Sequence, residues 1–549
     1  MKQTDPRKDP IALGLQQGWR VVDGRTLERD LSLQADVVIV GTGAGGASAA
    51  QLCAQAGLSV LMIEEGPLRS SSDFKMREAQ AYPELYQESA ARKTADQSIN
   101  ILQGRAVGGS TTVNWTSSFR TPQSTLAHWQ QHHGLQSFSP ESLAPWFDAV
   151  ERDLGIAPWT VTPNENNEAL RRGGQRLGIA VEVISRNVRG CWNLGYCGMG
   201  CPTNAKQSML VTSIPAALGR GAQLLHSVRA HRLLHRGEQI TALEALAMDS
   251  SGVHTRAVRI TVQAEHFIVA GGAVNSPALL LRSQIPDESG LLGHRTFLHP
   301  TVVAAALMPQ DVRGDAGAPQ SLYSDHHLQT QAIDGPIGFK LESAPLHPVL
   351  FSTTLQGFGA THRALMRGFS RTQVLLALMR DGFAPQSRGG QVRLRTDGSP
   401  VLDYPLDGFV WDGVRRAFRA MAEIQFAAGA REVTVVHEQA TLWRNWATAR
   451  REIDQLDLRP LLTRVVSAHV MGGCAMGADP RRSVTSPEGR VHALRNLMVA
   501  DGSLFPTSLG ANPQETIYAV VRRQVSQWLA SRTRQTSIPH TGARNERPT

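Results

Sequence analysis

The segment D36-V-V-I-V-G-T-G-A-G-G-A-S-A-A50 limits the fold of this chain more than any other part of the sequence. Its apolar run is typical of a buried parallel strand, and the Ala-rich stretch that follows is typical of a helix. Gly41 permits a tight turn, Gly43 lets the backbone approach a pyrophosphate, and Gly46 lets the helix pack close to the strand. Phosphates bind at such a helix N-terminus because its free N–H groups favour negative charge. The segment therefore predicts a dinucleotide-binding unit.

A second predicted strand, L58-S-V-L-M-I63, supports this interpretation. It ends at Glu64, about 20 residues beyond the glycines, where a carboxylate that binds the ribose is expected. The order strand, glycines, helix, strand and acid is far more specific to a dinucleotide-binding unit than the glycine pattern alone. An α/β fold with a parallel sheet follows from the pattern.

The length of the chain predicts more than one domain, because 549 residues exceed what a single hydrophobic core usually holds. The net charge of +9 comes from scattered arginines. Without a concentrated basic patch it does not predict a nucleic-acid partner. Only the tail from Arg532 to Arg547 is a basic segment of low hydrophobicity, and we expect it to be solvated.

The cellular location is predicted from the targeting and membrane segments that the sequence does not contain. No stretch approaches the roughly 20 apolar residues that span a bilayer, so we expect no transmembrane segment. The N-terminal residues lack the apolar core of a signal peptide. The five cysteines form no disulfide framework, which fits a reducing compartment. We expect a cytoplasmic protein, although export together with a signal-bearing partner would leave the same sequence.

Further blocks suggest how the domains are arranged. G104-R-A-V-G-G-S-T-T-V-N114 is a loop with little charge, and H266-F-I-V-A-G-G-A-V-N-S-P277 repeats the strand-to-turn pattern. After residue 300 the nucleotide-type motifs stop, which predicts an inserted substrate domain. The predicted boundaries are 33–300 and 465–535 for a discontinuous cofactor domain, 301–464 for the substrate domain, and 1–32 and 536–549 for terminal extensions.

The last block, from Ser467 to Gln514, places His469 and Asn512 in Gly-rich loops. Together with the three earlier blocks, it resembles the glucose-methanol-choline oxidoreductase family of FAD-dependent enzymes that act on alcohols. The resemblance covers roughly residues 33 to 530. It implies a Rossmann-like FAD-binding domain combined with a substrate domain built on an antiparallel sheet.

The resemblance also implies roles for individual residues. Relatives that attach flavin covalently use a histidine at the position of Val113, so FAD should bind here without a covalent link. The implied contacts are Gly41, Gly43, Gly46 and Glu64 for the ADP half, Gly108, Gly109 and Ser110 for the pyrophosphate or ribityl chain, Asn114 for the isoalloxazine, Val228 for the adenine side, and Asp501, Gly502 and Asn512-Pro513 for the turn over the flavin.

Alcohol oxidation removes the hydroxyl proton while the hydrogen on carbon leaves as hydride to flavin N5. Histidine is the side chain that titrates near neutral pH without perturbation. We therefore predict His469 as the general base, with Asn512 as a hydrogen-bonding partner of the alkoxide. The resemblance implies a small-molecule alcohol as substrate, and aliphatic, aromatic, sterol and sugar alcohols all remain open. A resemblance to long-chain alcohol oxidases implies a preference for apolar primary alcohols.

The segment C191-W-N-L-G-Y-C-G-M-G-C201 has a spacing that resembles the iron-sulfur site of FAD-dependent sugar dehydrogenases, and a similar segment occurs in long-chain alcohol oxidases. Three thiolates can hold a three-iron cluster, whereas structural zinc normally has four ligands. Buried cysteines without a ligand are the other interpretation. With a cluster at Cys191, Cys197 and Cys201, electrons would pass to a cytochrome or quinone; without it, oxygen is the expected acceptor.

Two other functions compete with alcohol oxidation. Some proteins of this family are hydroxynitrile lyases that keep FAD without redox use. An NAD-dependent dehydrogenase would share the glycine pattern around Gly41, but it would leave the block from Gly104 to Asn114 and the C-terminal loops unexplained.

Overall fold

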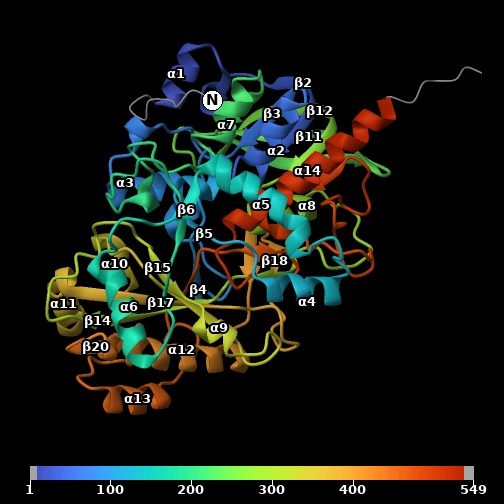
Figure 1. The fold of residues 1–549 in the computed structure, drawn as a ribbon. Helices are drawn as coiled ribbons and strands as arrows, with labels where there is room; N and C mark the ends of the chain where they lie inside the picture. Colours follow the sequence, from blue (N-terminus) through green and yellow to red (C-terminus); the bar gives the residue numbers. More distant parts are fainter. Residues whose placement is uncertain (1–8, 537–549) are drawn as a thin grey trace, which may run out of the picture.

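The computed structural model describes residues 9–536, and the ends of both predicted terminal extensions lie outside this range. Figure 1 shows two lobes, one above the other. The upper lobe contains a mostly parallel sheet with β2, β3 and β12, and the lower lobe contains an antiparallel sheet with β14 and β17. The mixed α/β architecture predicted from the sequence is confirmed.

The upper sheet is centred on β2 (Leu31–Val40), whose apolar end is fully buried. β2 pairs in parallel with β3 on one side and with β12 on the other. In spatial order the strands are β1 (Arg20–Asp23), β9 (Gln223–His226), β3 (Val60–Glu64), β2, β12 (Thr255–Val269), β11 (Gln239–Met248) and β10 (Val228–Arg236), with β23 (Leu497–Val499) also on β12.

Helix α2 (Ala44–Gln55) begins immediately after the glycine turn and packs against α7 (Ser213–Leu218) and α14 (Gln514–Thr536). Glycines make this close packing feasible. A Cβ on Gly45 would lie 1.6 Å from the carbonyl oxygen of Ala500, and one on Gly46 would lie 2.0 Å from that of Gly41. The helix N-terminus is thereby fixed against the ends of the parallel strands.

Side chains of the lower sheet point alternately to its two faces, and both faces are buried. Along β14 (Thr301–Leu307), Val302 and Ala304 enter the core under α12 (Gly408–Ala427), while Val303 and Ala305 face the other side. The spatial order is β4 (Ile99–Ile101), β21 (Val465–Ser467), β14, β17 (Thr372–Met379), β16 (Phe339–Ser343), β15 (Leu322–Ser324) and β7 (Glu182–Val183), with β20 (Glu432–Val435) also on β14.

The two lobes are interleaved in sequence. β4, β7 and β21 come from outside 301–464, and so does α6 (Glu165–Leu177), which packs on α12. Conversely, the hairpin of β18 (Gly390–Leu394) and β19 (Pro400–Asp403) packs on α8 (Gly272–Arg282) of the upper lobe. β1 also lies within the sequence range predicted as an N-terminal extension.

The remaining elements complete the two lobes. In the part of the chain that the structure describes, no helix is both long and apolar enough to cross a bilayer. The other α-helices, and the other strands of three or more residues, in the described range are α1 (Pro10–Gln16), α3 (Glu78–Leu85), α4 (Gln123–His133), α5 (Pro140–Leu154), α9 (His326–Gln329), α10 (Pro348–Thr354), α11 (Gly359–Arg367), α13 (Trp446–Gln455), β6 (Ile156–Pro158), β8 (Ser185–Asn187) and β13 (His294–Phe297).

Candidate active site

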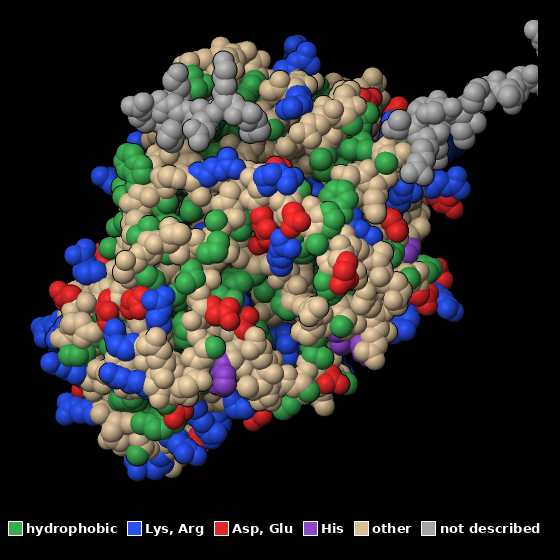
Figure 2. Space-filling model, viewed as in Figure 1, with side chains coloured by type: hydrophobic (Ala, Val, Ile, Leu, Met, Phe, Trp, Pro, Cys, Tyr) green, Lys and Arg blue, Asp and Glu red, His purple; other side chains and the backbone are tan. Residues whose placement is uncertain are grey.

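A cavity of about 840 Å³ runs from the glycine turn of the upper sheet to the lower sheet. Its walls come from segments that are far apart in the sequence. The face of the molecule shown in Figure 2 carries scattered charges of both signs. The predicted residues that line this cavity are Gly41, Gly43, Glu64, Gly109, Ser110, Asn114, Val228, His469, Asp501, Gly502, Asn512 and Pro513.

Two glycine loops meet at the upper end of the cavity. Gly109 has φ +55°, and a Cβ on it would lie 2.7 Å from the Cα of Gly43. A Cβ on Gly43 would instead have only the Cα of Gly109, at 3.9 Å, within contact distance, so this position faces open space. The arrangement leaves room for a pyrophosphate at the start of α2.

Glu64 is held in a fixed position at the end of β3. Its Oε2 accepts hydrogen bonds from the backbone N–H of Thr42, at 3.0 Å, and from the hydroxyl of Thr42, at 2.7 Å. Its Oε1 accepts one from the N–H of Gly66, at 2.9 Å. Burial raises the pKa of Glu64 despite these hydrogen bonds. Gly46 and Gly108 do not line the cavity, and each packs against other protein atoms beside the two glycine loops.

Asp501 connects its own turn to the start of α8 at the cofactor end. Its Oδ2 accepts hydrogen bonds from the N–H of Gly272, at 2.8 Å, and from the hydroxyl of Ser276. Its Oδ1 accepts the N–H and the hydroxyl of Ser503. The carboxylate therefore fixes the turn at Gly502 against the start of α8, as a turn that closes over a cofactor requires.

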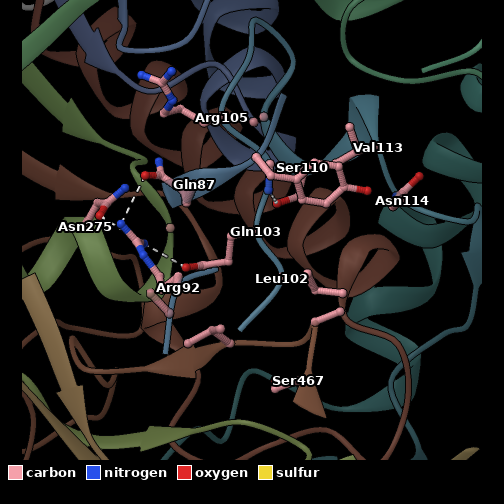
Figure 3. A pocket seen from close by; sticks show the side chains of 18 of the residues that line it. Gln87, Arg92, Leu102, Gln103, Arg105, Ser110, Val113, Asn114, Asn275 and Ser467 are labelled. Atoms are coloured by element: carbon pink, nitrogen blue, oxygen red, sulfur yellow. Dashed lines mark hydrogen bonds between the residues drawn. The ribbon is translucent and has the colours of Figure 1, made fainter. Parts of the chain in front are cut away.

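Figure 3 shows Ser110, Val113 and Asn114 along one side of the cavity. The Nδ2 of Asn114 donates a 2.7 Å hydrogen bond to Gln514, while its Oδ1 is buried without a partner in residues 9–536. This oxygen is therefore available to accept a hydrogen bond from a group outside the described chain. Gln514 was not predicted from the sequence, since its role depends on Asn114.

Arg92 is a buried cation on the opposite wall (Figure 3). Its guanidinium donates hydrogen bonds to Gln87 and Gln103, both at 3.0 Å, and to Asn275, at 3.4 Å. It also forms an ion pair with Glu88. This network holds the Arg92 guanidinium in a fixed position on the cavity wall, and its sequence segment carries no motif that would have revealed it.

His469 lies on the cavity wall and contacts a second, buried histidine, His299, that the sequence did not indicate. Their Nδ1 atoms are 3.2 Å apart. The backbone N–H of Gly510 donates a 2.9 Å hydrogen bond to Nε2 of His299. Neutral His299 must therefore carry its proton on Nδ1 and donate it toward Nδ1 of His469. It follows that neutral His469 carries its own proton on Nε2.

Both histidines are neutral at physiological pH. Burial, aided by the charge of Lys340, lowers the pKa of His469 to about 4. Burial lowers the pKa of His299 well below its usual value, and His469 and Lys340 add to this effect. The neutral pair presents an N–H donor at Nε2 of His469. For Nε2 of His469 to accept a proton, the ring would have to carry its own proton on Nδ1 instead.

Asp381 fixes the backbone that carries His299. Its carboxylate accepts hydrogen bonds from the N–H groups of Leu298, at 2.9 Å, and His299, at 3.1 Å, and from the hydroxyl of Tyr404, at 2.7 Å. His299 itself has φ +45°, a conformation that a non-glycine residue adopts only when its surroundings enforce it.

We expect Asp381→Ala to lower the free energy of unfolding by about 3 kcal/mol or more, because three buried donors lose their acceptor at once. Chemical denaturation measures this change. The matched control is Asp311→Ala on the surface, which should change the free energy by about 0.5 kcal/mol or less. Equal effects of the two substitutions would contradict the structural role of Asp381.

Glu342, on β16, is the second unpredicted residue at this end of the cavity. Its side chain is fully buried, and its Oε2 accepts hydrogen bonds from Gln320, at 2.6 Å, and from Nδ2 of Asn512, at 3.4 Å. Within the described residues, Oε1 of Glu342 and Oδ1 of Asn512 have no partner. Burial raises the pKa of Glu342 to about 7, even though Lys340 acts in the opposite direction.

The cysteine segment lies behind the cofactor end and does not line the cavity. Buried Lys206 connects the two, because its Nζ donates hydrogen bonds to the carbonyl oxygens of Thr112, at 2.6 Å, Asn114, at 3.0 Å, and Cys197, at 2.7 Å. In the described chain, no group of three or more His, Cys, Asp or Glu side chains is arranged to hold a metal ion. The cluster predicted at Cys191, Cys197 and Cys201 therefore has no support in this geometry.

The structure thus combines two glycine loops at the end of a parallel sheet with a polar cavity end on an antiparallel sheet. Two family models, both described as GMC oxidoreductase, match residues 82–301 and 385–520. A GMC-type oxidoreductase of Mycobacterium tuberculosis is 30% identical over 90% of this chain and 76% of its own length. The chain belongs to the GMC oxidoreductase family, as its motifs predicted.

Other relatives agree with this assignment. A long-chain-alcohol oxidase of Arabidopsis thaliana is 29% identical over 89% of this chain and 68% of the relative. Among solved structures, pyridoxine 4-oxidase from Mesorbium loti has a TM-score of 0.66 at 22% identity and covers 90% of this chain and 99% of its own. A formate oxidase has a TM-score of 0.67 at 15% identity, covering 92% and 99%. These two structures have the same fold.

Proposed function

We propose that this protein oxidises the CH–OH group of a small-molecule alcohol with bound FAD. The observation that carries the proposal is that a single cavity joins the glycine cradle at Gly43 to the polar end at His469 and Asn512. When bound, FAD supplies the hydride acceptor, its N5 atom. Membership of the GMC oxidoreductase family supports an oxidoreductase acting on alcohols.

The residues of the cavity fit this cofactor. The space beside Gly43 and Gly109 suits a pyrophosphate, Glu64 lies where a ribose would bind, and the orphaned oxygen of Asn114 can accept a donor from the flavin ring. Val113 occupies the place where a covalently linked relative would have histidine, so we propose that FAD is bound without a covalent link.

His469 and Asn512 would bind the hydroxyl group of the alcohol. The sequence predicts His469 as the general base, and this assignment stays a prediction. The hydrogen bond from His299 favours a different contribution, in which Nε2–H of His469 donates to the alcohol oxygen and stabilises its developing negative charge. His469 orients the substrate in either case.

The far arm of the cavity supports an apolar substrate. It runs between the lower sheet and α10 and is lined by aliphatic and aromatic side chains, namely Val303, Ala305, Leu346, Phe351, Leu355, Val374, Leu376 and Leu378. Such a lining would favour an alkyl chain and would bind a sugar poorly, because polar hydroxyl groups would lose their hydrogen bonds there. We therefore propose primary alcohols with an alkyl chain.

An anaerobic panel of primary alcohols tests this proposal through the flavin absorbance. Each methylene that enters the arm contributes about 0.8 kcal/mol, so the Kd from the saturation of flavin reduction should fall about fourfold per carbon until the arm is full. Glucose is the polar control. A flavin that no alcohol reduces would contradict the proposed reaction, and would favour the hydroxynitrile lyase alternative.

The electron acceptor is proposed as oxygen, with a cytochrome or quinone as the alternative if the cysteines hold a cluster. Nη2 of Arg186 lies 3.6 Å from Sγ of Cys197, and Nε and Nη1 of this buried arginine have no partner among the described residues. Hydrogen bonds from Thr203 and Lys206 also lower the pKa of Cys201, although burial acts to raise it. Iron and acid-labile sulfide assays on anaerobically purified protein decide between the two acceptors.

A further inference from the structure

The cavity reaches the protein surface near the start of β10, the strand whose Val228 the family resemblance places at the adenine side of FAD. Residues of three segments line the cavity here and are also exposed to solvent, namely His231, Val253, Arg395 and Asp397. One segment is β10 itself. The others are the loop between β11 and β12 (249–254) and the turn between β18 and β19 (395–399). This loop and this turn therefore form part of the rim of the cavity.

The β18–β19 turn is held in shape by its own hydrogen bonds. Oδ1 of Asp397 accepts the backbone N–H of Ser399, at 2.8 Å, and its hydroxyl, at 2.6 Å. The N–H of Gly398 donates to the carbonyl oxygen of Arg395, at 2.9 Å. Gly398 has φ +78°, which a turn this tight requires. Because these bonds are internal, the turn would move as one unit.

Arg282, the last residue of α8, joins this turn to the upper lobe, where α8 and β18 pack together (Figure 1). Its Nη1 donates a 3.2 Å hydrogen bond to the carbonyl oxygen of Gly398 in the turn. On β10, Nε donates to the carbonyl oxygen of His231, at 3.1 Å, and Nη2 to that of Ala230, at 3.5 Å. His231 lies in a bulge of the β10–β11 pairing, which leaves its carbonyl oxygen available for this contact.

The β11–β12 loop, on another part of the rim, is held more firmly. Arg105 and Arg229 each donate a hydrogen bond to a backbone carbonyl oxygen of this loop. Both guanidinium groups also pair with the carboxylate of Glu65, at 3.6 Å and 3.1 Å. The three acceptors of Arg282 are neutral carbonyl oxygens, which bind a guanidinium less strongly than a carboxylate does. The β18–β19 turn is therefore the part of the rim that opens more easily.

We propose that the β18–β19 turn is a gate through which FAD enters and leaves the cavity, and that Arg282 is the positioning residue that holds this gate closed. The proposal rests on the FAD site proposed above. The turn has the cavity on one side and solvent on the other, and the bond from Arg282 to Gly398 joins protein to protein. That bond would break whenever FAD enters and whenever it leaves. Arg282 would therefore control how fast FAD exchanges and not how tightly it binds.

The deciding experiment compares FAD exchange in the full-length wild type, Arg282→Met and Arg393→Met. Methionine retains much of the apolar length of arginine but donates no hydrogen bond. We expect Arg282→Met to raise the dissociation and association rate constants of FAD alike, by about tenfold, and to leave the Kd within about twofold of wild type. Flavin fluorescence measures dissociation after dilution of the loaded protein, and association after mixing apoprotein with FAD.

Arg393→Met is the matched control on the same hairpin. Arg393 is exposed on β18, pairs with Asp403 at 3.1 Å, and does not line the cavity. We expect it to change neither rate constant by more than about twofold. Arg282→Lys keeps the charge and one donor group, so its rate constants should lie between those of wild type and Arg282→Met.

A second substitution tests the gate without removing a buried side chain. Asp397→Ala deletes the acceptor that holds Ser399 inside the turn, and Asp397 is exposed, so the fold should persist. We expect both rate constants to rise about threefold, because a loosened turn opens more often. Thermal unfolding of each apoprotein verifies that the variant is folded.

Each outcome supports or overturns the inference. Wild-type rate constants in folded Arg282→Met or Asp397→Ala would overturn the gate. Faster dissociation with unchanged association would raise the Kd and show that Arg282 contacts FAD directly, which also contradicts the gate. Wild-type apoprotein that binds no FAD would overturn the FAD site and this inference together. The expected exchange rates in a protein whose flavin no alcohol reduces would overturn alcohol oxidation and leave the gate intact.

Discussion

Replacing His469 by alanine is expected to lower the rate constant of flavin reduction by alcohols about 100-fold or more, while FAD stays bound. The substitution removes the N–H donor that the bond from His299 directs into the cavity. Gly43, Glu64 and Asp501, at the cofactor end, are unaffected. Anaerobic stopped-flow absorbance measures the rate constant, and the flavin-to-protein absorbance ratio measures FAD content.

The comparison with His469→Gln distinguishes the two roles of this residue. Glutamine can donate a hydrogen bond from its amide but has no nitrogen that accepts a proton. If His469 is a donor, His469→Gln should retain part of the activity that His469→Ala loses. If His469 is the base, both variants should be equally slow. Reduction of His469→Ala at the wild-type rate would remove this residue from the reaction altogether.

The Gly43→Ala variant is expected to weaken FAD binding about 100-fold while leaving the apoprotein as stable as wild type. A Cβ at Gly43 has space in the protein itself, with only the Cα of Gly109 nearby, at 3.9 Å. It would therefore occupy the volume where the pyrophosphate approaches the backbone. A 100-fold loss corresponds to about 2.7 kcal/mol of binding free energy. Fluorescence titration of apoprotein with FAD measures this loss.

Gly46→Ala is the matched control on the same helix. Its Cβ would lie 2.0 Å from the carbonyl oxygen of Gly41, so α2 must move away from the strand. We expect a loss of apoprotein stability, by thermal unfolding, that Gly43→Ala does not show. Identical behaviour of the two variants would contradict the assignment of Gly43 to the cofactor and Gly46 to packing.

The cofactor end of the site was predictable from sequence because its chemistry depends on local backbone geometry. A strand, a tight turn and a helix start within fifteen residues, so the positions of Gly41, Gly43 and Gly46 follow from their spacing. Membership of the GMC oxidoreductase family confirms the resemblance that these motifs indicated. His469 and Asn512 were predicted for the same reason, since each lies within a recognisable Gly-rich block.

Glu342 and His299 could not be predicted in this way. Each lies in a segment without a motif, and Glu342 occupies an ordinary strand of the lower sheet. Their importance arises from contacts with residues far away in sequence: Gly510 is 211 positions from His299, and Asn512 is 170 positions from Glu342. The interleaving of the two lobes, in which β21 pairs with β14 and β4 pairs with β21, was not predicted for the same reason.

The sequence by itself determined the nucleotide-binding unit and the family, because both depend on short-range spacing that constrains the backbone directly. Only the tertiary structure decided how protons are arranged at the reaction end. The direction of the hydrogen bond between His299 and His469, and the burial of the Glu342 carboxyl group beside Asn512, depend on donors and acceptors that folding brings together. Such interactions leave no periodicity or spacing in the chain.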